Sequence, residues 1–284
     1  MQLMAMILSV LLVSGAETRS GEALQGLSER YDLQKRAARF DLPGRLREVS
    51  GLTSTPAGYL LAHGDERGRV YRIDPATEDV DRGFSLGAGN TRDDFEGVAW
   101  ADGRLFLVSS KGLLYEFREA AEGSTTPVRV TDTGLGRTCE VEGLAFDKAA
   151  HHLLLACKTI APPAPEARVH RIPLDPGSAR VPPIRVALTE LTRFGLAAVL
   201  HPSGIAVDPS TGTLVLVAAR EEALVEIDRH GNVLSAVQLS KRRHPQPEGI
   251  AFGADGALYI ADEANGRDAR LTVYRRISEP GGTP

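Results

Sequence analysis

Polar residues recur at one position of this chain, directly before a glycine that opens an apolar segment. The five glycines are Gly51, Gly97, Gly143, Gly204 and Gly249. The residues before them are Ser50, Glu96, Glu142, Ser203 and Glu248. Carboxylates that converge from separate repeats could bind a hard cation such as Ca2+, which takes about six to eight oxygen ligands.

A second polar residue stands two positions before each of these serines and glutamates. The members of this second set are Glu48, Asp94, Glu140, His201 and Gln246. Equivalent positions of structural repeats meet in space. The two sets therefore predict one shared polar site together with a repeated fold.

The repeats have the length of propeller blades. Successive glycines are 46, 46, 61 and 45 residues apart. The fourth repeat reads as four strands, over 203–207, 213–219, 223–228 and 233–239, joined by turns rich in Asp, Pro and Gly. Four antiparallel strands in about 45 residues are typical of one blade. The longer third repeat adds a proline-rich loop over 160–165 and a segment over 189–198 with room for helical turns.

The last repeat lacks an outer strand, and a spare strand-like segment precedes the first repeat. The spare segment covers residues 30–43. If it completes the last blade, the ring closes without a long exposed edge. The sequence therefore predicts an all-β, five-bladed β-propeller over residues 30–278 whose last blade is closed by an N-terminal strand.

Charged residues gather at one mouth of the central channel in such a fold. The start of an innermost strand and the end of the antiparallel second strand lie at the same end of a blade. The expected metal ligands are Glu48, Asp94, Glu96, Glu140, Glu142, Glu248, Asp262 and Glu263. The expected contacts to an anionic ligand are Lys111, Lys158, Arg220, His201 and Gln246. We expect Ca2+ as the cofactor and identify no catalytic residue.

A purely structural explanation of this mouth competes with the binding site. Glu96 or Glu142 could form ion pairs with Lys111, Lys158 or Arg220 and fasten one blade to the next. However, acids outnumber cations here, and crowded carboxylates repel one another unless a cation neutralises them. Blades one and four carry serine where the other three carry glutamate, and this asymmetry favours a site over a symmetric ring.

The start of the chain suggests an exported protein, and its charge bears on the class of partner. The net charge of −4 and the lack of a basic face argue against nucleic acid as a partner. Residues 1–16 contain a short apolar run followed by small residues, which is typical of a signal peptide. An uncleaved membrane anchor or a misassigned start are the alternatives. We expect a linker over 17–29 and a disordered tail over 279–284.

The two cysteines, Cys139 and Cys157, flank one predicted hairpin. A regular register with Phe146 opposite Leu153 places Cys157 opposite Glu142 rather than Cys139. A disulfide needs Cα atoms within about 7 Å. We therefore expect two small buried residues rather than a disulfide, although an exported protein could pair them.

Several segments of this chain resemble the SdiA-regulated, YjiK/CarP-like β-propeller family of bacteria. The segments lie at 48–52, 94–98, 139–146, 153–158, 202–209 and 247–252, and the resemblance extends over residues 30–276. It implies a small propeller outside the cytoplasm or at the inner membrane, with a phytase-like fold and a link to calcium homeostasis. It implies no particular reaction.

These observations lead to three hypotheses about function. The first is an exported, monomeric, regulatory propeller that binds Ca2+ or a small anionic ligand at the acidic mouth, in the periplasm, secreted, or anchored to the inner membrane. The second is a metal-assisted phosphoesterase or lactonase at the same mouth, and whether the protein is an enzyme stays open. The third is a scaffold that binds another protein.

Overall fold

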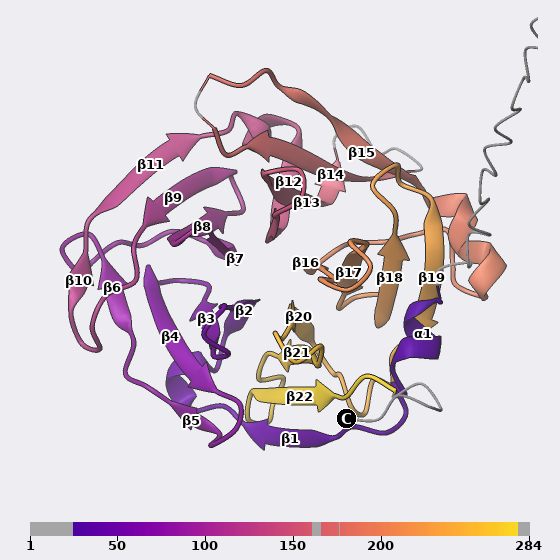
Figure 1. Ribbon diagram of the computed structural model, residues 1–284, viewed down its shortest axis with the longest axis horizontal. Helices are drawn as coiled ribbons and strands as arrows, with labels where there is room; N and C mark the ends of the chain where they lie inside the picture. Colours follow the sequence, from indigo (N-terminus) through magenta and orange to yellow (C-terminus); the bar gives the residue numbers. More distant parts are fainter. Residues whose placement is uncertain (1–24, 161–165, 176, 278–284) are drawn as a thin grey trace, which may run out of the picture.

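Five β-sheets form a closed ring around a central axis in the computed structural model, which describes residues 25–160, 166–175 and 177–277 (Figure 1). This arrangement is a five-bladed β-propeller and confirms the predicted fold. The expected leader over 1–16, the tail over 279–284 and most of the proline-rich loop lie outside the described residues. In the described part, no helix is long and apolar enough to span a bilayer.

The blades are numbered in chain order, and the strands of each blade are given from the innermost strand outward. Blade 1 contains β2 (Val49–Ser54), β3 (Leu60–Gly64), β4 (Arg69–Asp74) and β6 (Phe84–Leu86), with β5 (Asp79–Val80) and β10 (Thr125–Thr126) added at its outer edge. Blade 2 contains β7 (Phe95–Ala101), β8 (Arg104–Ser109), β9 (Leu113–Phe117) and β11 (Val128–Asp132). Blade 3 contains β12 (Cys139–Asp147), β13 (His152–Ile160), β14 (Glu166–Pro173) and β15 (Val181–Ala187).

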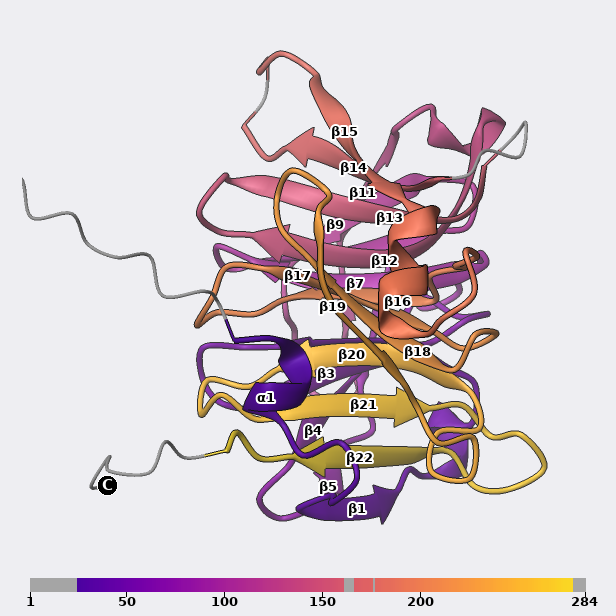
Figure 2. The ribbon, with the colours of Figure 1, turned by 90° about the vertical axis from the view of Figure 1, so that its right-hand side faces the viewer.

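The last two blades follow the same plan. Blade 4 contains β16 (Gly204–Val207), β17 (Leu214–Ala218), β18 (Ala223–Ile227) and β19 (Val233–Gln238). Blade 5 contains β20 (Pro247–Phe252), β21 (Leu258–Asp262) and β22 (Arg270–Tyr274). The helices of the described residues are α1 (Leu27–Arg30) and the short 3-10 segments η1 (Gly44–Leu46), η2 (Leu135–Arg137) and η3 (Leu188–Phe194). As the sequence suggested, η3 provides helical turns in the long third repeat, where it lies against β19 (Figures 1 and 2).

An N-terminal strand closes the ring. Strand β1 (Ala38–Asp41) pairs antiparallel with β22, with Phe40 opposite Leu271. This pairing confirms the predicted closure. Helix α1 covers the end of the 17–29 stretch expected as a linker, together with Arg30, and contacts β19 (Figure 1).

Apolar side chains between neighbouring blades form the core. Blades 4 and 5, for example, enclose Val217, Leu224, Ile250 and Leu258, which are 0 to 2% exposed. Strands β17 and β18 are buried along their whole length because both of their faces contact other blades. The sequence of β17 is therefore a continuous apolar run, whereas β18 also includes the buried Glu226.

Four of the five innermost strands contain a β-bulge at the mouth. An extra residue interrupts the pairing at Ser50, Glu96 and Glu248, and in blade 3 Glu142 and Gly143 together lie opposite Ala156. A bulge leaves one residue outside the ladder and redirects its side chain. Strand β16 of blade 4 pairs without such an interruption. The three glutamates of the repeat are thus all bulge residues.

The cysteines form a disulfide, so the expectation of two unpaired cysteines was wrong. Cys139 and Cys157 have Cα atoms 5.6 Å apart. The predicted pairing of Phe146 with Leu153 is present, but two register shifts nearer the mouth place Cys157 opposite Val141 instead of Glu142. A regular register contains no bulge, and it is these two bulges that bring the cysteines within bonding distance.

Candidate functional site

The inner strands approach one another very closely where the repeated glycines lie. A Cβ atom at Gly97 would lie 2.6 Å from the backbone nitrogen of Leu144, and one at Gly204 would lie 2.5 Å from the carbonyl oxygen of Glu248. Side chains larger than hydrogen do not fit at these two positions. The glycines therefore allow the inner strands to approach closely beside the bulge residues.

Three glutamates and one lysine lie together in this mouth. The Lys158 ammonium donates to Oε1 of Glu142 at 2.8 Å. Lys158 is itself the extra residue of a bulge in β13, so both members of the ion pair stand outside the regular ladder. Glu96 of blade 2 and Glu248 of blade 5 are close enough that the charge of Glu142 affects the pKa of each.

The pKa values of these glutamates are raised. Burial, together with the carboxylates of Glu142 and Asp94, raises the pKa of Glu96 to about 10. Burial and the charge of Glu142 raise the pKa of Glu248 to about 8. Burial also raises the pKa of Glu142, although the bond to Lys158 opposes this shift. One ammonium thus does not compensate the acids, and Glu96 and Glu248 hold protons at neutral pH unless another cation is present.

A second group of acids continues the mouth over blades 1 and 5. Burial and the charge of Glu48 raise the pKa of Asp65. Burial, followed by the charges of Asp65 and Glu48, raises the pKa of Glu263. The Gln246 side-chain amide donates to Oε2 of Glu263. Asp65 was not among the residues proposed from the sequence, although the end of the second strand, where it lies, pointed to this region.

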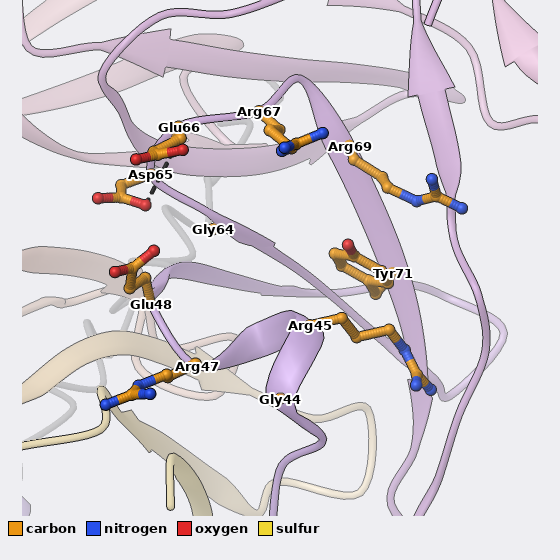
Figure 3. A pocket seen from close by; sticks show the side chains of 10 residues that line it. All are labelled: Gly44, Arg45, Arg47, Glu48, Gly64, Asp65, Glu66, Arg67, Arg69 and Tyr71. Carbon is orange, nitrogen blue, oxygen red and sulfur yellow. Dashed lines mark hydrogen bonds between the residues drawn. The ribbon is translucent and has the colours of Figure 1, made fainter. Parts of the chain in front are cut away.

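A hollow of about 360 Å3 leads outward from this second group across blade 1 (Figure 3). Glu48 and Asp65 face each other at its inner end, and Arg45, Arg69 and Tyr71 line the other end. The Arg45 and Arg69 guanidinium groups donate to the carbonyl oxygens of Asp81 and Arg82, at 3.0 and 2.9 Å. Arg47 and Arg67 also line the hollow, which therefore combines acidic and basic walls.

Four other residues proposed from the sequence form no hydrogen bond with the carboxylates of these two groups, although His201 lines a hollow together with Lys158. Lys111 is exposed. His201 is held by Glu221, with Nδ1 of the ring 2.7 Å from Oε1, and Nη1 of Arg220 lies 3.3 Å from Nε2 of the same ring. Asp262 is fully buried, with Oδ2 2.9 Å from Nδ1 of His244.

Glu140 and Asp94 occupy the exposed rim of the mouth. The Thr159 hydroxyl donates to Oε2 of Glu140 at 2.7 Å. Within the described residues, the one set of three ligand-type side chains whose atoms lie within 4.8 Å of one another is Cys139, Cys157 and His170. Because the disulfide occupies both sulfurs, that set offers no thiolate. A cation at the mouth would have to draw the carboxylates together.

Residues 94–266 match the sequence model of the SdiA-regulated family. The chain belongs to the SdiA-regulated family. The matched region includes Glu96, Glu142, Lys158 and Glu248, whereas Glu48 and Asp65 precede it. No curated protein matches the chain.

Solved structures similar to this SdiA-regulated protein are also propellers of low sequence identity. The glutaminyl cyclase of Myxococcus xanthus is 15% identical, with a TM-score of 0.58 over 86% of this chain and 97% of that chain. The PQQ-bound aldose sugar dehydrogenase of Streptomyces coelicolor is 14% identical, with a TM-score of 0.53 over 84% of this chain and 98% of that chain. At such identities the similarity shows the fold alone.

Proposed function

We propose that this protein is an exported regulatory propeller that binds Ca2+ at the mouth formed by Glu96, Glu142 and Glu248. The observation that carries the proposal is the crowding of three carboxylates at the mouth, where burial, and then neighbouring charges, raise the pKa of Glu96 to about 10 and that of Glu248 to about 8. A divalent cation would neutralise this surplus, and Ca2+ accepts oxygen ligands in irregular geometry.

The bulges supply a reason why these residues could bind a cation rather than only fasten the blades. An ion-pair ring would be expected to match each acid with a base, but Lys158 pairs with Glu142 alone. Glu96 and Glu248 have no salt bridge within 4.0 Å among the described residues. Their carboxylates interact with the side chains of Asp94 and Gln246 but form a salt bridge with no cationic group of the described residues, so an ion could bind them.

Export is supported by the disulfide and by the apolar run near the start of the chain. Disulfides persist in oxidising compartments such as the periplasm. The bond between Cys139 and Cys157 is therefore consistent with a protein outside the cytoplasm. The apolar run of the expected leader lies among residues 1–16, outside the described part.

A thermal unfolding experiment tests the proposal. Millimolar Ca2+ should raise the melting temperature of the wild-type protein, because a ligand that binds only the folded state stabilises it. The E96Q/E142Q double variant should lose this rise. The matched control, E122Q/E190Q, removes two acids that are 44 and 42% exposed and should keep it. An unchanged wild-type melting temperature at millimolar Ca2+ rejects the proposal.

A metal-assisted phosphoesterase or lactonase is a second candidate, and the hollow in Figure 3 favours it. The metal would supply an activated water and polarise the substrate. Arg47 and Arg67 line the hollow beside Glu48 and Asp65, where they could hold an anionic group of the substrate. Hydrolysis of phosphate esters or lactones that requires Ca2+ and disappears in E96Q/E142Q would support this candidate. A panel without metal-dependent turnover would exclude it.

A further inference from the structure

Six arginines surround a second hollow, of about 230 Å3, at the outer part of blade 5. We call it the arginine pocket. Its lining residues are Arg36, Arg39, Arg242, Arg243, Arg267, Arg270 and Thr272. They come from β1, β22, the segment before β1 and the loops that precede β20 and β22. Figure 1 shows β1 and β22 side by side at the outer edge of this blade.

Residues that line the arginine pocket also contain buried polar atoms without partners. The Nε atoms of Arg243 and Arg270 and the Oγ1 atom of Thr272 have no hydrogen-bond partner. Arg270 is 5% exposed and Thr272 is 1% exposed. A buried donor without an acceptor costs free energy, and a buried charge without a partner costs more. These three atoms lie in the wall behind the hollow, and the inference of an outside acceptor rests on the guanidinium groups that surround it.

In the described part of the chain, no acidic side chain forms an ion pair with these arginines. Among the described residues, no carboxylate oxygen lies within 4.0 Å of a side-chain nitrogen of any of the six. Asp41 and Asp262 lie opposite Arg270 on the flanking strands, but Asp262 interacts with His244 instead. The chain carries a net charge of −4, so a generally basic composition does not explain the cluster.

The walls of the arginine pocket are fixed by neighbouring contacts. Both terminal nitrogens of Arg243 donate to Gln34, one to its carbonyl oxygen and one to Oε1. Arg270 and Thr272 belong to β22, and Arg39 lies opposite Thr272 in β1. Groups that are already held in place lose less conformational entropy when a ligand binds.

We propose that the arginine pocket binds a small free anion that carries two or more phosphate groups. The guanidinium fork matches phosphate oxygens and forms charge-assisted hydrogen bonds with them. Six positive charges exceed what one singly charged anion neutralises. The volume is several times that of one water molecule, which occupies about 30 Å3 of the liquid. This site is separate from the mouth and does not depend on the proposed binding of Ca2+.

Titration calorimetry with inorganic pyrophosphate, in a buffer with a chelator to exclude Ca2+, tests this proposal. We expect one saturable site per chain. R36Q and R39Q, at the exposed rim, should each weaken the affinity about tenfold, because each removes a charge-assisted contact. R118Q removes the same charge from an exposed arginine that does not line this pocket and should leave the affinity unchanged. E96Q/E142Q should also bind normally.

A third variant, R270Q, removes the buried arginine and should weaken binding at least as much as the rim variants. If the R270Q chain does not fold, R36Q and R39Q decide the result. The absence of saturable binding to the wild type overturns the proposal, as does an equal loss in R118Q. Vesicles containing phosphatidic acid provide the last comparison, and binding to these vesicles without binding to pyrophosphate would overturn the choice of a free anion.

Discussion

Glu96 and Glu248 make the stability of the protein depend on pH in an unusual direction. A carboxyl whose folded-state pKa is raised binds its proton more tightly in the folded chain than in the unfolded chain. Its effect on stability is therefore unfavourable above the unfolded pKa, near 4.5, and grows as pH rises toward the folded value of about 8 for Glu248 and about 10 for Glu96.

We predict that the melting temperature of the Ca2+-free protein falls between pH 6.5 and pH 9, and that it falls less in E96Q/E248Q. The variant keeps neutral side chains over the whole range, so its two positions release no proton. Thermal unfolding in a series of buffers measures both slopes. Burial lowers the pKa of His63 to about 4, so the neutral imidazole stabilises the fold less as pH falls below 6.5. The range therefore begins at pH 6.5, above the titration of His63. If the melting temperatures of the wild type and E96Q/E248Q fall equally with pH, the raised pKa values of Glu96 and Glu248 are contradicted.

The sequence indicated some of these residues and missed others for identifiable reasons. The Ser/Glu pattern before the glycines singled out Glu96, Glu142 and Glu248, because the repeat fixes their place near the axis. Whether Lys111, Lys158 or Arg220 would pair with them could not be decided, since that depends on the bulge at Lys158. The arginine walls of both hollows involve loop residues, and no repeat determines the path of those loops.

The bulges in β12 and β13 connect the disulfide with the proposed binding site. Glu142 and Lys158 are the extra residues of the two strands, and Cys139 and Cys157 lie on either side of these irregularities. The bond thus ties the strand segments that carry the ion pair. A period-two strand pattern contains no sign of a bulge, which is why the register predicted for the cysteines was wrong.

Removal of the disulfide should destabilise the protein by roughly 2–4 kcal/mol, the usual effect of a bond that closes a short loop. Urea denaturation of C139S/C157S measures this loss. The wild type treated with a reductant serves as the control and should unfold at the same urea concentration as the variant. A variant as stable as the oxidised wild type would show that the bond contributes nothing to this hairpin.

The ring as a whole depends on contacts made by residues far apart in the chain. Before β1, the Arg30 guanidinium donates to Asp208 at 2.9 Å and to Glu226 at 2.7 Å, and all three side chains are 1 to 2% exposed. Tyr31 packs beside Phe252, and its hydroxyl donates to the carbonyl oxygen of Gly256 at 2.7 Å. The N-terminal segment therefore joins blade 4 to blade 5 in addition to supplying β1.

Arg30→Met should destabilise the protein by about 3–5 kcal/mol, because it leaves the carboxylates of Asp208 and Glu226 buried without their cation. Arg92→Met is the matched control, since Arg92 and its partner Glu66 are 59 and 64% exposed. Such exposed pairs contribute at most about 1 kcal/mol. Chemical denaturation of both variants compares the two effects. Similar losses would mean that the buried cluster does not fasten the ring.

The five blades and their closing strand were predictable from the sequence, because the spacing of the glycines measures the blades directly. The docking of α1 was not, since a helix of four residues leaves no periodic pattern and Arg30 reads as an ordinary surface residue. The partners of Arg30 are 178 and 196 residues away in the chain. Only the closed ring brings them together.

Crystals grown with Ca2+ provide the most direct test of the proposed function. Anomalous difference density should show one ion at the mouth, with carboxylate oxygens of Glu96, Glu142 or Glu248 at about 2.3–2.6 Å. The same crystals of E96Q/E142Q should lack this density. A wild-type mouth without an ion at millimolar Ca2+, with Glu96 and Glu248 in the positions described above, would contradict the assignment of a calcium site.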